Sequence, residues 1–247
     1  MCTKITIENA AVLLIGNELL SGKVRDANLQ EIARTLRALG IELVSVSMIG
    51  DCVERIADEV RRLRSFGAVF TSGGVGPTHD DVTVRAVARA LDVPMVQSAA
   101  IETLLHRFHG EGVTAEHLRM AWVPEGARLE YCPQSPWPVV VADNIWLLPG
   151  VPEVFRAKLE VVRCALRGPG QFVTRNVYCR NDETQLCPAL EAVAAEFPSV
   201  AVGSYPQWGE GEYQTHVTFD GRSHADVERC QAKFLSLLVP EEVVRSD

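Results

Sequence analysis

The chain has 247 residues, 47% of them hydrophobic and 23% charged, and its 24 basic and 32 acidic side chains give a net charge of −8. This composition excludes a disordered or collagen-like chain, and the length suffices for one large domain or two ordinary ones. The acidic balance argues against a protein that binds nucleic acid or an anionic membrane, because phosphate groups attract basic surfaces.

The sequence also indicates the cellular compartment in which the protein is expected. Apolar runs near the N-terminus are about six residues long, far short of the roughly 20 that a membrane-spanning helix needs, and no signal-peptide pattern is present. The seven cysteines are widely spaced and form no C-x-x-C pair, so they predict neither a disulfide framework nor a zinc knuckle. We expect a reduced, cytoplasmic protein in which thiols act as small buried side chains.

The first half of the chain alternates strands and helices. Residues 10–15 form an unbroken apolar run, which predicts a strand buried on both faces. Asp26 or Asn28 is expected to cap the helix that follows. Further runs and helical spacings predict a helix over 29–39, a strand over 41–49, a helix over 53–63, a strand over 68–71 and a helix around 86–91. This alternation predicts a parallel sheet with helices on both faces.

The second half is less regular. A helix is expected over 101–108, short strands within 128–148 around a proline-rich loop at 133–138, and a helix from Pro152 to about residue 167. Gly168-Pro169-Gly170 is the strongest boundary signal. We therefore expect an α/β domain at 1–170 and a small α+β domain at 171–247 with elements in the order βαββα.

The strongest motif is TSGGVGPTHDD at residues 71–81, which leaves a buried strand and enters a helix. Glycines let a ligand approach the backbone, and free N–H groups at a helix N-terminus favour an anion such as phosphate. In an open parallel sheet, ligands bind at this edge. Asp80 and Asp81 could hold a divalent cation or position a water molecule. The alternative is that one aspartate caps the helix and the other is a first-turn charge.

Two other loops follow predicted strands. Residues 16–28 read GNELLSGKVRDAN, which is not a P-loop, because five residues separate the glycines and valine follows the lysine. This loop brings Glu18, Asp26 and Asn28 to the same sheet edge, unless it is a plain polar loop in which Asp26 caps a helix. Residues 148–152 read LPGVP and form another strand-to-helix turn, which could be purely structural.

Together with Gly50-Asp51, these loops resemble the molybdopterin-binding-like domain of the CinA family, whose fold the MoaB and MogA proteins share. The segment GSYPQW at 203–208 is similar to the corresponding domain of eukaryotic FAD synthases. The resemblance implies a three-layer α/β/α core with a mostly parallel sheet, followed by a small domain of KH-like topology. It also implies a homo-oligomer, a dimer rather than a trimer.

The resemblance implies a nucleotide pyrophosphatase that cleaves the diphosphate of ADP-ribose or FAD-like substrates with a divalent cation of the Mg, Mn or Co class. Two alternatives stay open: a protein that binds or adenylylates molybdopterin in molybdenum-cofactor biosynthesis, and a non-catalytic nucleotide-binding module. The implied catalytic residues are Asp80, Asp81, Glu18 and Asp26, with Asp80 and Asp81 as metal ligands. The implied ligand-binding residues are Gly16, Asn28, Asp51, Gly73, Gly74, Gly76, Pro77, Thr78, Pro149 and Gly150.

The chain departs from the family pattern at two places. Asn17 stands where the family usually has aspartate, which weakens a metal ligand there. Residues 134–138 are bulkier than the family's glycine-containing loop, which leaves the choice of substrate open. The negative charge is uneven: residues 173–247 carry 6 basic and 12 acidic side chains, net −6, whereas residues 1–172 carry 18 and 20, net −2. A small phosphate ligand in the first domain is therefore compatible with the charge, but RNA binding by the tail is not expected.

Overall fold

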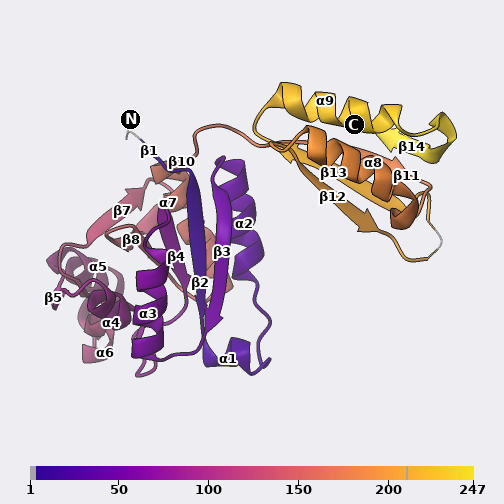
Figure 1. The fold of residues 1–247 in the computed structure, drawn as a ribbon. Coiled ribbons are helices and arrows are strands. Elements are labelled where there is room, and N and C mark those ends of the chain that lie inside the picture. Colours follow the sequence, from indigo (N-terminus) through magenta and orange to yellow (C-terminus); the bar gives the residue numbers. More distant parts are fainter. Residues whose placement is uncertain (1–3, 210) are drawn as a thin grey trace. The chain divides into compact units, whose positions relative to one another are not determined.

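The computed structural model describes residues 4–209 and 211–247, so Cys2, one of the thiols expected to be buried, lies outside the described residues. Contacts divide the chain between Pro169 and Gly170 into two units, which are considered separately (Figure 1). Six free cysteines are described; three of them are buried, and Cys187 is exposed.

Strand β2 (Asn9–Ile15) lies inside the sheet of the first unit, and its sequence explains the layers around it. The strand is apolar almost throughout, as burial on both faces of a sheet requires. Because successive side chains point to opposite faces, Val12 and Leu14 join one hydrophobic core and Leu13 and Ile15 another. The first core includes α2 (Asn28–Ala38) and α7 (Pro152–Ala165), and the second includes α3 (Val53–Leu63) and α4 (Thr83–Ala90).

The sheet has six strands in the order β3-β2-β4-β9-β8-β7. Strands β3 (Glu42–Ile49), β4 (Ala68–Ser72) and β9 (Ile145–Leu148) continue the parallel pairing of β2, whereas β8 (Ser135–Ala142) and β7 (Arg128–Cys132) pair antiparallel. Helices cover both faces of this mostly parallel sheet, as Figure 1 shows around β2 and β3. The predicted three-layer α/β/α fold is thereby confirmed.

A small lobe is inserted between α4 and β7. Its hydrophobic cluster contains Ile101, Leu105 and Val123, and Trp137 of the sheet packs against it. The lobe consists of β5 (Met95–Gln97), α5 (Ala99–His109), a 3₁₀ turn (Gly110–Gly112), α6 (Ala115–Arg119) and β6 (Trp122–Pro124). The remaining elements of the unit are α1 (Asn17–Leu20) and the paired short strands β1 (Ile5–Thr6) and β10 (Leu166–Arg167).

Strand β8 corrects one prediction. The sequence predicts a loop at 133–138, but β8 already begins at Ser135, so two of the three prolines of that segment, Pro136 and Pro138, lie within a strand. The pairing of β8 with β7 contains a register shift at this place. Pro136 and Pro138 have no N–H to donate, and an irregular stretch of the ladder tolerates them. The proline-rich segment is therefore held in place rather than looped out.

The second unit corrects another prediction. Its elements follow the order βαββαβ rather than βαββα, with a four-stranded antiparallel sheet ordered β12-β13-β11-β14. This is a ferredoxin-like arrangement and not the expected KH-like topology. The last strand has only two apolar residues, too short a pattern to be recognised. The elements are β11 (Val173–Cys179), α8 (Glu183–Glu196), β12 (Ala201–Pro206), β13 (Thr215–Gly221), α9 (His224–Ser236), a 3₁₀ turn (Pro240–Glu242) and β14 (Val243–Ser246).

The core of the second unit lies between its sheet and its two helices. Val177, Val217 and Phe219 of the strands pack with Val193 of α8 and Phe234 of α9. In neither unit does a described helix combine the length and hydropathy that a membrane crossing requires.

Candidate functional site

A pocket of about 1000 Å³ opens in the first unit where the parallel strands end. Open α/β sheets bind ligands at this edge, and the volume suits a large small-molecule ligand. One end of the pocket, here called the glycine-loop end, contains all the predicted site residues except Asp26 and Asn28. The lining residues there are Gly16, Glu18, Asp51, Gly73, Gly74, Gly76, Pro77, Thr78, Asp80, Asp81, Pro149 and Gly150.

Gly73 and Gly74 turn the chain away from β4. Their φ angles of +109° and +67° lie in the left-handed region that glycine adopts without steric cost. A Cβ on Gly74 would lie 2.3 Å from the hydroxyl oxygen of Thr83, and one on Gly73 would lie 2.2 Å from the carbonyl oxygen of Ile15. The Thr83 hydroxyl donates to the Gly73 carbonyl at 2.8 Å, and the backbone N–H of Thr83 donates to the Gly74 carbonyl at 3.0 Å. The loop is thus fixed between β2 and α4.

Thr78 brings two carboxylates together at the tip of this loop. Its N–H donates to Oδ2 of Asp81 at 2.8 Å, and its hydroxyl oxygen lies 2.6 Å from Oδ1 of Asp80 and close to the same Asp81 oxygen. A hydroxyl has one proton, so it donates to one carboxylate at a time. The hydrogen bond from Thr78, aided by the backbone of Asp80 and by His79, holds the pKa of Asp80 below its usual value. Asp80 is therefore ionised at neutral pH.

Glu18 and Asp51 add two further carboxylates. Glu18 folds back over Gly16, where an added Cβ would lie 2.3 Å from its Oε1. Asp51 accepts the backbone N–H of Asn17 at 2.8 Å, and the Asn17 side-chain oxygen accepts the Asp51 N–H at 3.4 Å. Asn17 therefore joins α1 to the loop after β3 and does not line the pocket.

Asp26 and Asn28 lie behind the pocket lining. Asp26 accepts the N–H groups of Asn28 at 3.3 Å and Leu29 at 3.0 Å, which satisfies donors at the start of α2. The amide of Asn28 donates to the Ser72 hydroxyl at 2.9 Å and to the Gly150 carbonyl at 2.8 Å. The contacts of Asp26 suit a residue that caps α2. Those of Asn28 suit a positioning residue that joins the loops after β4 and β9. A catalytic role for Asp26 and ligand contact by Asn28 stay predictions.

The glycine-loop end is strongly acidic. Among its described lining residues are Glu18, Asp51, Asp80 and Asp81, and neither lysine nor arginine. A diphosphate at this end would be repelled unless a cation accompanied it. Within the described ranges, no three His, Cys, Asp or Glu side chains form a group that could hold a metal ion. Magnesium is often held by one or two carboxylates plus substrate phosphates, so the Asp80–Asp81 pair fits a cation that arrives with its phosphates.

The other end of the pocket, here called the aromatic end, was missed by the sequence analysis. It is formed by side chains of α5, β6, β8 and α7, and includes Phe108, Trp122, Trp137 and Lys158. The Phe108 and Trp137 rings lie 5.8 Å apart at 51°. The available signal was the segment at 134–138, which is bulkier than the family's loop and for which the sequence left the choice of substrate open.

Lys158 is unusual at this end because it is only 6% exposed. Its ammonium donates to the carbonyl oxygens of Trp137 at 2.5 Å and Pro138 at 3.0 Å. Burial lowers the pKa of Lys158 to about 8, since a charged amine loses hydration there. The lysine thus holds the proline-rich part of β8 against α7.

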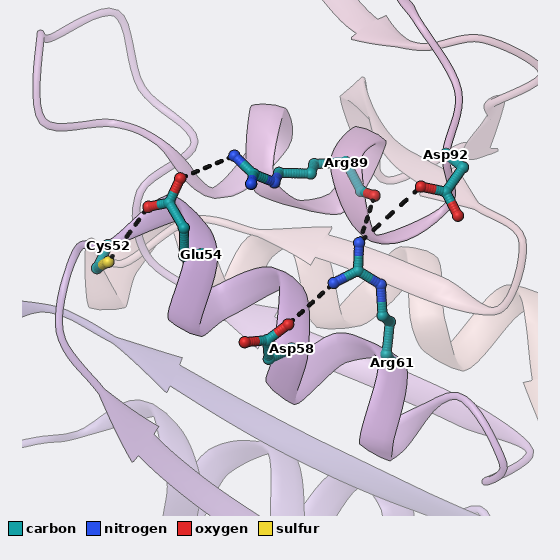
Figure 2. A network of polar contacts seen from close by, with 6 residues as sticks. All are labelled: Cys52, Glu54, Asp58, Arg61, Arg89 and Asp92. Carbon is teal, nitrogen blue, oxygen red and sulfur yellow. Dashed lines mark hydrogen bonds and ion pairs between the residues drawn. The ribbon is translucent and has the colours of Figure 1, made fainter.

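Outside the pocket, a polar network joins α3 to α4, the helix whose first residue holds the glycine loop (Figure 2). Glu54 accepts from Arg89 at 2.7 Å and from the Cys52 thiol at 3.6 Å. Arg61 donates to Asp58 and to the Arg89 carbonyl, each at 2.9 Å, and lies 4.0 Å from Asp92. Exposed ion pairs contribute little to stability, so the network links the surfaces of α3 and α4 without being a main source of stability.

Comparison with known families accounts for both units. A family described as the probable molybdopterin binding domain matches residues 11–167. A second family, the FAD synthase middle domain, matches residues 171–247. The first match covers most of the chain, which therefore belongs to the family of probable molybdopterin binding domains.

Individual relatives agree with these matches. A probable FAD synthase of Caenorhabditis elegans is 30% identical over 94% of this chain, which spans only 50% of that relative. Protein TK1472 of Thermococcus kodakarensis is 31% identical, and the alignment covers 92% of this chain and 98% of the relative. The crystal structure of the protein CinA from Thermoplasma acidophilum matches with a TM-score of 0.58 and 27% identity, covering 64% of this chain and 97% of that one.

Proposed function

We propose that this member of the family of probable molybdopterin binding domains binds a nucleotide diphosphate derivative in its pocket and hydrolyses the diphosphate with the help of a divalent cation. The substrate class is that of ADP-ribose or FAD. The name of the C. elegans relative, a probable FAD synthase, supports a nucleotide of this kind.

One observation carries the proposal: glycine loops and four carboxylates meet at one end of the pocket. Glycine-rich turns before helices suit phosphate oxygens, because backbone N–H groups can approach them. Among the described lining residues of this end there is no lysine or arginine, so four carboxylates suit phosphates only if a cation is present, because they would otherwise repel them. A site for an uncomplexed anion would carry arginine or lysine here.

Each group of residues would have its own role in this reaction. The backbone of the loops at Gly73, Gly74 and Gly150 would face the phosphates, and Asp80 and Asp81 would hold the cation, which would offset the phosphate charge. Glu18, in the short helix α1, is the candidate to accept a proton from water. The water oxygen bonds to one phosphorus, the bridging P–O bond breaks, and the bridging oxygen leaves on the other phosphate.

The test is a screen of ADP-ribose, FAD, NAD and coenzyme A with magnesium, manganese or cobalt, with product nucleotides measured by chromatography. AMP release from ADP-ribose or FAD that requires added metal is expected. Absence of release from every substrate with every metal, by protein whose folding is verified by circular dichroism, would contradict hydrolysis.

Binding of a pterin is the second candidate, and the family match over residues 11–167 favours it. It predicts that a pterin copurifies with the protein or binds to it without being hydrolysed. Mass spectrometry of small molecules released from the denatured protein distinguishes the two candidates, as does the screen above.

A further inference from the structure

Two thiols meet where the β7–β8 hairpin packs on α7. Cys132 is the last residue of β7 and is buried, whereas Cys164 lies in the last turn of α7 and is partly exposed. Cys132 belongs to the hydrophobic core on this face of the sheet, and Cys164 packs against the same core. The two residues are far apart in the sequence, so the fold alone brings them together.

The contacts of Cys164 show that the two thiols lie close to each other. Its thiol donates to Oε1 of Gln134, in the turn that directly follows β7, at 3.8 Å. A side-chain hydrogen bond also joins Cys164 to Cys132. One S–H proton serves one acceptor at a time, so the Cys164 thiol can turn toward either partner. Thiols in contact on two packed elements can form a disulfide with little movement of the backbone.

The other buried thiols have different surroundings. Cys179 and Cys230 lie in the core of the second unit. Burial, and then the nearby carboxylates of Glu242 and Glu196, raise the pKa of each thiol to about 11. Buried thiols that stay protonated are unreactive. Cys164 differs from them because solvent reaches its side chain and a second thiol lies beside it.

We propose that Cys132 and Cys164 are a redox pair, which a hydroperoxide converts to a disulfide that ties the β7–β8 hairpin to α7. Cys164 is the thiol that meets the oxidant, because it is partly exposed, and Cys132 then closes the bond. Neither thiol is among the described lining residues of the pocket. The inference is therefore independent of the proposed hydrolysis.

The reaction balances with hydrogen peroxide as the oxidant. The Cys164 thiolate attacks one peroxide oxygen, the O–O bond breaks, hydroxide leaves, and a sulfenic acid remains on Cys164. The Cys132 thiolate attacks that sulfur, the S–O bond breaks, and a second hydroxide leaves as the S–S bond forms. The two thiol protons convert the hydroxides to water, so two sulfurs are oxidised and one peroxide is reduced.

The surroundings of Cys164 set the speed of the first step. Burial and the neighbouring Cys132 thiol raise the pKa of Cys164 above its usual value. Because only the thiolate attacks peroxide, the reaction is expected to be slow at neutral pH and faster in alkaline solution. The pair would thus stay reduced until the oxidant is abundant.

The disulfide would fasten two walls of the pocket to each other. Lys158 of α7 lies near Cys132 and donates to the carbonyls of Trp137 and Pro138 in β8. These hydrogen bonds can break and form again, whereas a disulfide joins the hairpin to the helix covalently. A cross-link also restricts the unfolded chain, so oxidation should stabilise the first unit.

The test is to treat the full chain with hydrogen peroxide in mildly alkaline buffer, label the remaining thiols with a maleimide and digest the protein without reduction. We expect mass spectrometry to find peptides joined through Cys132 and Cys164 that separate on reduction. Oxidation should raise the urea midpoint by about 1 M. Cys164→Ser should abolish both results, and any effect of methionine oxidation is common to both proteins.

Cys187→Ser is the matched control, because Cys187 is an exposed thiol of the second unit. It should keep both the linked peptides and the higher urea midpoint. Cys132→Ala tests the second step: Cys164 should then stop at the sulfenic acid, which dimedone traps. If Cys132→Ala does not fold, Cys164→Ser carries the test, because its side chain is partly exposed.

Two results would overturn the redox pair. The first is maleimide on both Cys132 and Cys164 after peroxide treatment, or linked peptides that contain a different pair of cysteines. The second is a sulfinic acid on Cys164 while Cys132 remains a free thiol, which would show that Cys132 does not reach the oxidised sulfur.

Discussion

The two ends of the pocket are built in different ways. The glycine-loop end consists of short backbone turns that directly follow β2, β4 and β9, and its charged groups are aspartates and glutamates. The aromatic end consists of side chains from α5, β6, β8 and α7, and its one lysine is buried. The first end offers backbone groups and negative charge, which suit a reaction. The second offers shape, aromatic faces and one donor, which suit recognition.

In this fold, the groups that suit a reaction and the groups that suit the selection of a ligand therefore lie at different ends of the pocket. The loops at strand ends are fixed by the sheet, so substitutions there should alter rate or stability. The aromatic end is assembled from an inserted lobe and a hairpin, so substitutions there should alter which ligand binds.

The largest effect is expected from Asp81→Asn, which keeps the shape of the side chain and removes its charge. Hydrolysis of ADP-ribose or FAD should fall about 100- to 1000-fold, the loss typical when one group that stabilises charge in a site is removed, because Asp81 is proposed to hold the cation. Steady-state rates at saturating metal measure it. Asp92→Asn is the matched control, an exposed aspartate outside the pocket, and its rate should equal that of the wild type. Equal rates for both variants would show that the carboxylates at this end do not take part in catalysis.

Next in size is the loss of stability expected from Gly74→Ala. The added Cβ would combine a left-handed backbone with a contact of 2.3 Å to Thr83, at a cost of about 2–4 kcal/mol in the free energy of unfolding. Gly22→Ala is the control, because Gly22 has φ +70° but no atom within 4 Å of an added Cβ; about 1 kcal/mol is expected there. Urea denaturation compares the two. Similar losses would mean that Thr83 moves aside freely.

The same contrast explains what the sequence could predict. The buried strand at 10–15 and the glycine string at 71–81 are local signals, so the parallel sheet and one end of the pocket follow from them. Trp137, Phe108 and Lys158 are far apart in the chain, and each fits a hydrophobic core or a surface when taken alone. Only the folded chain brings them together. The strand β14 and the strand conformation at Pro136 were missed for a related reason, because short or proline-containing strands depend on their partners.

A smaller effect concerns Lys158 and pH. Its pKa falls from 10.5 to about 8 on folding, so between these values the unfolded chain binds more protons and stability rises with pH. The stability of wild type relative to Lys158→Met should therefore increase by about 2 kcal/mol from pH 8 to pH 10. Urea titrations of both proteins give this difference, and the neighbouring thiol of Cys132 is common to both. A difference that is constant between pH 8 and pH 10 would show that the pKa of Lys158 does not fall on folding.

The smallest effect is expected from Asn17→Asp, which restores the residue that the family usually has. Its side chain faces the N–H of Asp51 and not the pocket, so hydrolysis should change by no more than about twofold, as for one exposed charge. Initial rates at several magnesium concentrations measure it. A tenfold gain that depends on metal would place position 17 among the cation ligands.

Gly150 has a consequence for redesign. A Cβ there would lie 3.3 Å from the Cα of Gly73, so the loops after β4 and β9 touch backbone to backbone. A side chain at Gly150 would require the Gly73 backbone to yield by a few tenths of an ångström, and Gly73 itself, with φ +109°, lies too close to Ile15 for a side chain. Engineering that aims at a new ligand would therefore rebuild α5 and the β7–β8 hairpin and keep both glycine loops as an unchanged module.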